Sequence, residues 1–186
     1  MAIGVRTRRF SVEEYHRVVR AGILKEDDRV ELIEGEIIEM TPIGLRHSFC
    51  LARVTDHFAV SLHGLAVVWV QSPIGLSPDS EPQPDLAVVR PPLTQYADAH
   101  PGAGDVFLVI EVADTTVDHD RTRKIPLCAG AGVREAWLVN LPAQTIEVYR
   151  APTGEGYQDV RTLGRGQRLA PEAFQDLTLT VDDILG

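Results

Sequence analysis

The chain has 186 residues, of which 44% are hydrophobic and 24% charged, and its formal net charge is −9. This composition is typical of a soluble domain with a hydrophobic core, and the acidic charge argues against a protein that clings to nucleic acid through a basic surface. No apolar run approaches the ~20 residues of a transmembrane helix. The first residues lack a signal-peptide pattern, and the only cysteines, Cys50 and Cys128, are far apart. We therefore expect a single cytoplasmic domain over residues 1–186, with free thiols.

A capping-box pattern predicts a short helix near the N-terminus. In Ser11-Val-Glu-Glu14, the Ser11 hydroxyl and the Glu14 carboxylate can each satisfy a backbone N–H of the first helical turn. The expected helix spans about residues 12–21, and Gly22 suits the position that follows its last turn. We interpret this helix as structural.

A β-hairpin is expected next. Two short apolar runs, at residues 29–33 and 36–40, are joined by a Glu-Gly pair, which is typical of a tight turn between strands. The hairpin is rich in glutamate. For Glu31 and Glu39 we favour an ordinary solvated acidic surface.

The following helix carries a histidine of interest. Apolar residues recur at intervals of three and four between residues 45 and 62, which predicts a helix. His47 lies in its first turn, away from the apolar stripe. A single histidine is weak evidence for a site. A strand is expected at residues 66–70.

Two acidic residues stand beside apolar runs in the middle of the chain. Residues 106–110 form an unbroken apolar run, which predicts a strand buried on both faces, with Glu111 at its end. A carboxylate in such a run is costly to desolvate unless a cation or hydrogen bonds compensate. Another strand, at residues 82–90, is entered through Asp85. The connection over residues 91–104 is rich in proline and glycine, so we expect it on the surface.

The segment after the central strand supplies a lysine. Residues 114–123 are polar, and a helix is expected to follow that either starts late, with Pro126 in its first turn, or is kinked at this proline. Asp120 and Lys124 share one face if both are helical. Further strands are expected at residues 135–140, 145–150, 160–163 and 177–181.

Asp85, Glu111 and Lys124 together fit a specific chemistry. Two carboxylates on adjacent strands can hold Mg²⁺ or Mn²⁺, which prefer oxygen ligands. A lysine beside them can stabilise developing negative charge while the metal activates or orients a water, as phosphodiester hydrolysis requires. The alternative is a pair of unrelated strand-end acids, because the sequence alone does not show that the acids meet. The sequence contains no Walker loop, HExxH motif or Gly-x-Ser-x-Gly elbow.

The same residues resemble a known nuclease pattern. Pro84-Asp85 followed by Glu111 is similar to the skeleton of the PD-(D/E)XK nucleases, and the chain more closely resembles the Uma-two family of proposed endonucleases. The matching blocks, which together span about residues 30–150, are 30–42, 46–47, 83–86, 109–112, 120–124 and 131–139.

This resemblance implies a restriction endonuclease-like α/β fold, a mixed β-sheet flanked by helices. It implies Asp85 and Glu111 as catalytic, metal-holding carboxylates and Lys124 as the catalytic lysine. In the standard pattern the lysine lies two residues after the glutamate, where this chain has an alanine. Related nucleases take a further acid from the first core helix, and here His47 and Glu36 are the candidates for that part of the site.

The sequence therefore predicts a nuclease that depends on Mg²⁺ or Mn²⁺ and hydrolyses phosphodiester bonds of nucleic acid, with DNA as the first choice. A homodimer is suggested by analogy with nucleases that cut two strands, and no membrane partner is expected. The rival interpretation is a non-catalytic module that binds nucleic acid or protein on the same fold. The acidic net charge and the displaced lysine favour this rival, and a fold does not by itself fix a function.

Overall fold

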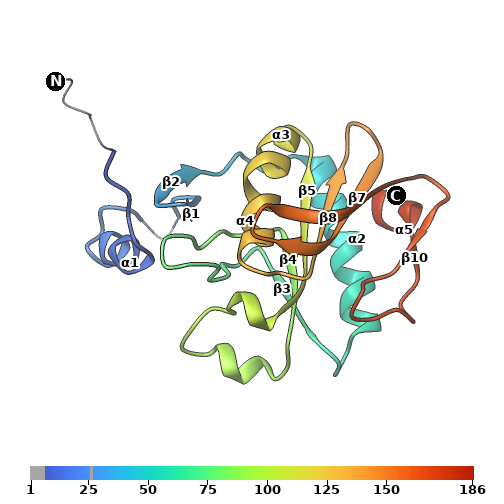
Figure 1. Cartoon of the computed structure of the whole chain (residues 1–186), viewed down its shortest axis with the longest axis horizontal. Helices are drawn as coiled ribbons and strands as arrows, with labels where there is room; N and C mark the ends of the chain where they lie inside the picture. Colours follow the sequence, from blue (N-terminus) through green and yellow to red (C-terminus); the bar gives the residue numbers. More distant parts are fainter. Residues whose placement is uncertain (1–6, 26) are drawn as a thin grey trace.

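The computed structural model of the protein describes residues 7–25 and 27–186, so the first six residues, where the sequence shows no signal-peptide pattern, lie outside it. Helix α1 (Val12–Arg20) and the hairpin of β1 (Val30–Ile33) and β2 (Glu36–Glu39) lie together at one end of the molecule (Figure 1). The predicted capping box is confirmed, because the Glu14 N–H donates to Ser11 Oγ and the Ser11 N–H donates to a Glu14 carboxylate oxygen, both at 3.2 Å.

The hairpin turn explains the Glu-Gly pair of the sequence. Glu34 and Gly35 have positive φ angles of 49° and 76°. A side chain at Gly35 would also collide with Arg9, so both the backbone conformation and the close approach require glycine here. The turn thereby fixes the register of β1 against β2, in which Glu31 lies opposite Ile38.

A six-stranded mixed sheet forms the centre of the molecule, in the order β3-β4-β5-β6-β7-β8. All neighbouring strands are antiparallel except β5 and β6, which are parallel. The strands are β3 (Val67–Val70), β4 (Leu86–Val89), β5 (Val106–Ala113), β6 (Glu135–Asn140), β7 (Thr145–Thr153) and β8 (Gly156–Gly164). The expected mixed sheet is therefore confirmed.

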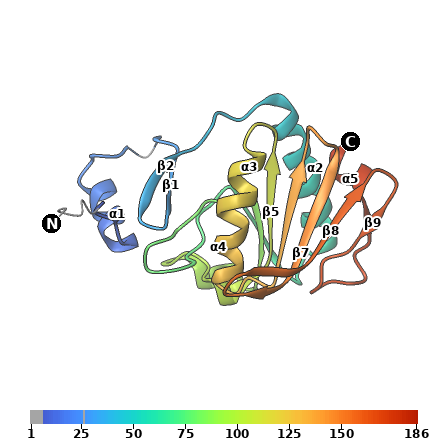
Figure 2. The same cartoon turned by 45° about the horizontal axis from the view of Figure 1, so that its top comes forward.

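Helices cover both faces of this sheet (Figure 2). One face packs against α2 (Leu45–Ser61) and α5 (Val181–Leu185), and the other against α4 (Ile125–Gly130). Strand β5 is buried on both faces, as predicted, because Ile110 and Val112 join the first core and Val109 the second. Within residues 7–25 and 27–186, no helix combines the length and the apolar character that crossing a bilayer would need.

The C-terminal region departs from the sequence prediction. A strand over residues 177–181 was expected, but only Leu179–Thr180 is extended, as β10, which pairs with β9 (Arg168–Leu169). Helix α5 begins at Val181 because Thr180 and Asp183 form a capping box, in which the Asp183 N–H donates to Thr180 Oγ1 at 3.1 Å. The surface connection over residues 91–104 contains the short 3₁₀ turn η1 (Leu93–Tyr96) and the start of η2 (Ala103–Asp105).

Pro126 lies in the first turn of α4, but the helical chain does not start there, because helical residues precede it without a break from Val117. The preceding helical chain consists of α3 (Val117–His119) and the π-helical turn η3 (Asp120–Lys124), in which the Ile125 N–H donates to the Asp120 carbonyl. A π turn is wider than an α turn, so it accommodates a proline that lacks an N–H and crowds the preceding turn. This widened turn carries Lys124 toward the sheet.

Candidate active site

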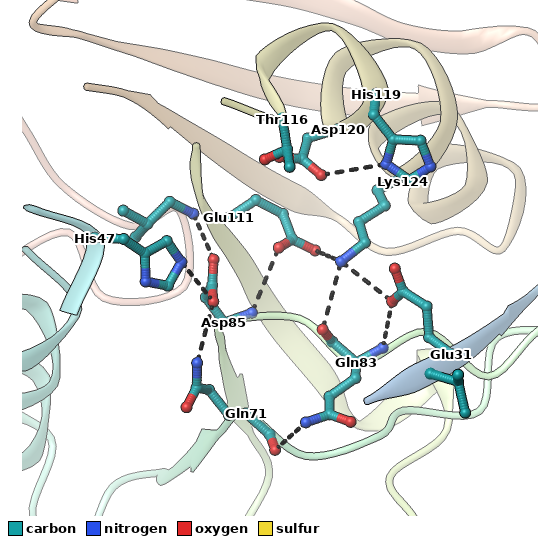
Figure 3. A network of polar contacts seen from close by, with 12 residues as sticks. Glu31, His47, Gln71, Gln83, Asp85, Glu111, Thr116, His119, Asp120 and Lys124 are labelled. Carbon is teal, nitrogen blue, oxygen red and sulfur yellow. Dashed lines mark hydrogen bonds and ion pairs between the residues drawn. The ribbon is translucent and has the colours of Figure 1, made fainter. Parts of the chain in front are cut away.

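A groove of about 410 Å³ lies between the hairpin, the first turn of α2 and the segment from β5 to η3. Four of the predicted site residues line it, namely His47, Asp85, Glu111 and Lys124. Figure 3 shows their side chains converging from these separate elements. The structure thus brings together residues that are far apart in the sequence.

The Asp85 carboxylate is held at both oxygens. Asp85 stands immediately before β4, because the strand begins at Leu86. Its Oδ1 lies 2.9 Å from His47 Nε2, and its Oδ2 accepts the Val112 N–H at 2.8 Å. The other ring nitrogen of His47 is buried and has no hydrogen-bond partner within the described residues. The histidine is therefore oriented by its contact with Asp85.

Glu111 lies within β5 and not at its end, because the strand continues to Ala113. The pairing of β4 with β5 places Leu86 opposite Ile110, so the two acids occupy neighbouring positions. The Asp85 N–H lies 3.4 Å from Glu111 Oε2, which confirms that Asp85 and Glu111 meet. The two acids are therefore neighbours in the fold, which the sequence alone did not show.

Lys124 reaches the acidic pair from the π-helical turn. Its Nζ lies 3.3 Å from Glu111 Oε1 and 3.2 Å from Glu31 Oε2. It also donates to the Gln83 carbonyl at 3.4 Å. A lysine displaced along the sequence thus lies beside the carboxylate of β5, as the resemblance implies.

Glu31 is a site residue that the sequence analysis missed. A solvated surface was expected, but Glu31 is only 4% exposed and forms an ion pair with Lys124. A signal was available, because Glu31 stands inside the apolar run of β1 in the same way as Glu111 stands inside β5.

Glu36 has different neighbours from those expected, and Asp120 lies beside the site. Glu36 pairs with Arg123 at 3.2 Å and with Arg9 at 3.6 Å, so the structure does not bring it to the acidic pair. Asp120 accepts the Thr116 hydroxyl at 2.6 Å and lies near His119. Asp120 is buried and lines the groove, and its hydrogen bond with Thr116 holds the start of the helical segment.

The electrostatics of the site are dominated by buried acids around one ammonium group. Burial raises the pKa of Glu111 well above its ordinary value, and although Lys124 opposes this change, Asp120, Asp85 and Glu31 reinforce it. Burial by itself would lower the pKa of Lys124, but the carboxylates of Glu111 and Glu31 outweigh burial and raise it. Lys124 therefore stays charged, and burial together with the neighbouring acids disfavours the ionised form of Glu111.

This donor set suits a hard divalent cation. Among residues 7–25 and 27–186, no group of three or more His, Cys, Asp or Glu side chains is arranged to hold a metal ion. Mg²⁺, however, is usually bound through one or two carboxylates and keeps several waters. Asp85 and Glu111 would supply two such carboxylates, and a cation would favour the ionised form of Glu111 that its surroundings disfavour.

Comparisons with known proteins agree with this fold. Residues 12–182 match the family model Uma2, described as "Putative restriction endonuclease". The chain belongs to the Uma2 family. Among solved structures it is similar to a "putative nuclease belonging to DUF820" from Anabaena variabilis ATCC 29413, with 20% identity, a TM-score of 0.78, and coverage of 95% of this chain and 97% of that one. This likeness confirms the restriction endonuclease-like fold that the sequence predicted for the Uma2 chain. A search among curated proteins finds no match.

Proposed function

We propose that this Uma2 protein is a divalent-metal-dependent endonuclease that hydrolyses phosphodiester bonds of nucleic acid, with DNA as the first substrate to test. The observation that carries the proposal is the meeting of Asp85, Glu111 and Lys124 in one groove. The descriptions of the family and of the similar solved structure support a nuclease-like function.

The proposed roles follow from the contacts of each side chain. Asp85 and Glu111 would hold Mg²⁺ or Mn²⁺, which when bound supplies charge neutralisation and an activated water. Lys124 presents a fixed positive charge that stabilises negative charge developing on the phosphate. His47 keeps the Asp85 carboxylate in one orientation.

The position of Lys124 weighs against the rival interpretation of a non-catalytic binding module. That rival drew support from the displaced lysine, and Lys124 Nζ lies 3.3 Å from Glu111 despite the displacement. The acidic net charge of −9 remains compatible with a nuclease, because bound divalent cations reduce the local negative charge that nucleic acid meets.

Cleavage assays with isosteric variants test the proposal. Supercoiled plasmid, single-stranded DNA and RNA would be incubated with the protein in Mg²⁺, Mn²⁺ or excess chelator. Asp85→Asn and Glu111→Gln should abolish cleavage, whereas Asp159→Asn, which alters a half-buried acid on β8, should not. Asparagine at position 85 keeps an oxygen for the Val112 N–H, so thermal unfolding should show that the variant is folded.

The outcomes separate the two functions. Cleavage that persists in Asp85→Asn or in chelator would contradict the proposed site. Absence of cleavage of every substrate by the wild-type protein, together with nucleic-acid binding in a gel-shift assay, would favour the binding module.

A further inference from the structure

Lys124, Glu31 and Gln83 form a closed ring of polar contacts beside the acidic pair (Figure 3). The Lys124 ammonium lies 3.2 Å from Glu31 Oε2, and the same oxygen accepts the Gln83 N–H at 3.0 Å. The Gln83 carbonyl accepts from Lys124 Nζ at 3.4 Å and closes the ring. Because Gln83 stands two residues before Asp85 in the sequence, the ring ties the lysine to the segment that carries the first acid.

This ring holds a charge that is almost completely buried. The Lys124 side chain is 7% exposed and the Glu31 side chain 3%. A buried ammonium needs paired charge and hydrogen bonds to offset its desolvation. Glu111 meets part of this need, but its carboxylate is also the proposed metal ligand. A cation that shares Glu111 would weaken the hold of that carboxylate on Lys124, whereas Glu31 can serve the lysine alone.

The hydrogen bonds of Glu31 point to the lysine as its partner. Oxygen Oε2 already receives both Lys124 Nζ and the Gln83 N–H. Both donors come from the protein, so this one oxygen joins the ammonium to the segment that leads into Asp85. The carboxylate of Glu31 is therefore engaged as an acceptor for protein groups.

The hairpin is attached to the π-helical turn through consecutive residues. While Lys124 pairs with Glu31 of β1, its neighbour Arg123 pairs with Glu34 at 3.3 Å and with Glu36 at 3.2 Å. The ion pairs of Arg123 are more exposed than that of Lys124, since the Glu34 side chain is 54% exposed. Glu34 therefore offers a matched control, a hairpin glutamate that holds the adjacent residue and not the lysine.

We propose that Glu31 is a positioning residue that holds the Lys124 ammonium at the groove and leaves the Glu111 carboxylate available for the metal ion. This inference rests on the proposed nuclease function and adds a residue from the hairpin to it. In this assignment Glu31 holds the lysine, and Glu111 is left to bind the metal ion.

Lysine labelling tests the positioning without any cleavage reaction. The sequence contains only Lys25, which is exposed, and Lys124, so each chain carries its own reference lysine. The metal-free protein would be treated briefly with acetic anhydride, and acetylation of each lysine would be measured by mass spectrometry. The Lys124-to-Lys25 ratio should rise several-fold in Glu31→Gln and stay at the wild-type value in Glu34→Gln. An unchanged ratio in Glu31→Gln would overturn the proposal.

Kinetics and metal titration test the consequence for the reaction. Glu31→Gln should lower kcat by ~10–100-fold, the usual cost of losing a supporting contact at a metal site, with KM little changed. The Mn²⁺ affinity should fall by less than in Glu111→Gln, because Lys124 then depends on the Glu111 carboxylate alone. Glu31→Asp should recover part of the loss, because it restores the charge on a shorter side chain. Mn²⁺ binding that weakens as much in Glu31→Gln as in Glu111→Gln would make Glu31 a metal ligand and overturn the positioning role.

The failure of this inference is distinguishable from the failure of the proposed function. Wild-type cleavage together with wild-type kcat in Glu31→Gln would overturn the role of Glu31 alone. Absence of cleavage by the wild-type protein would overturn the nuclease function, and with it any role of Glu31 in the reaction, even if the labelling ratio rises as expected.

Discussion

His47 Nε2 lies 2.9 Å from Asp85 Oδ1, so the first turn of α2 contacts the residue that precedes β4. The other oxygen of Asp85 accepts the Val112 N–H of β5 at 2.8 Å. The carboxylate is thus fixed between a helix and the central strand. A preorganised carboxylate loses little freedom when it takes up a ligand, which is a property that a metal-dependent site needs.

Replacement of His47 should weaken the site without unfolding the protein. His47→Ala removes the contact with Asp85 Oδ1, and the loss of such a supporting partner typically costs 10–100-fold in metal affinity or activity, so a decrease of about this size is expected. Mn²⁺ calorimetry and kcat/KM for cleavage would measure it. His63→Ala, at an exposed position after the same helix, is the control. Wild-type affinity and activity in His47→Ala would show that this contact is dispensable.

As the pH falls, Mn²⁺ binding should begin to weaken at a higher pH than it would at a site built from ordinary carboxylates. Burial and the neighbouring acids raise the pKa of Glu111 well above its ordinary value of 4.5, so protons compete with the metal well above that pH. Binding should release protons, which calorimetry in buffers of different ionisation enthalpy detects. Glu111→Gln should abolish this proton release. An affinity that stays constant down to about pH 4.5 would contradict the elevated pKa of this carboxyl group.

The ion pair between Glu147 and Arg121 should stabilise the fold in a pH-dependent way. Arg121 donates to both Glu147 oxygens, at 2.6 and 3.0 Å, and its hydrogen bonds lower the pKa of Glu147 below 4.5. A lowered folded-state pKa gives stability that is present above the unfolded pKa and lost as pH falls through the folded one. Glu147→Gln should therefore lower the free energy of unfolding by ~1–2 kcal/mol at pH 7, and the difference should fade in strongly acidic buffer.

Urea unfolding of wild-type protein and Glu147→Gln at several pH values would measure this difference. Asp159→Asn removes an exposed pair with Arg161 on β8, so it should change the free energy of unfolding by well under ~1 kcal/mol. A Glu147→Gln effect of the same size in acid as at pH 7 would rule out an ion pair as its source.

The core beneath the site should depend strongly on Phe58. This side chain is fully buried on α2, and its ring packs against Trp137 of β6 with centroids 5.9 Å apart. Phe58→Ala should lower the free energy of unfolding by ~3–5 kcal/mol, because it leaves a cavity between helix and sheet. Phe49→Ala on the same helix removes a ring that is 56% exposed, so its effect on urea unfolding should be much smaller. Similar costs for both variants would contradict this packing.

Several elements could be predicted from the sequence because their causes are local. The capping box at Ser11 and the three- and four-residue spacing of α2 act within one or two helical turns. The unbroken apolar run of β5 predicted a strand buried on both faces, and Glu111 within that run predicted a compensated carboxylate. The resemblance of Asp85, Glu111 and Lys124 to a family pattern indicated which residues belong to the candidate site.

Only the tertiary structure decided which glutamate of the hairpin reaches Lys124. Glu31 and Glu36 share one face of the hairpin, because Glu31 lies opposite Ile38 and Glu36 lies opposite Ile33. They differ in their position along the strands, so the docking of the hairpin against the π-helical turn places Glu31 beside Lys124 and Glu36 beside Arg123. Side-chain periodicity predicts the face that a residue occupies within its own element. It carries no information on how that face meets a segment far away in the chain, because this is set by the packing and charge pairing of the complete fold.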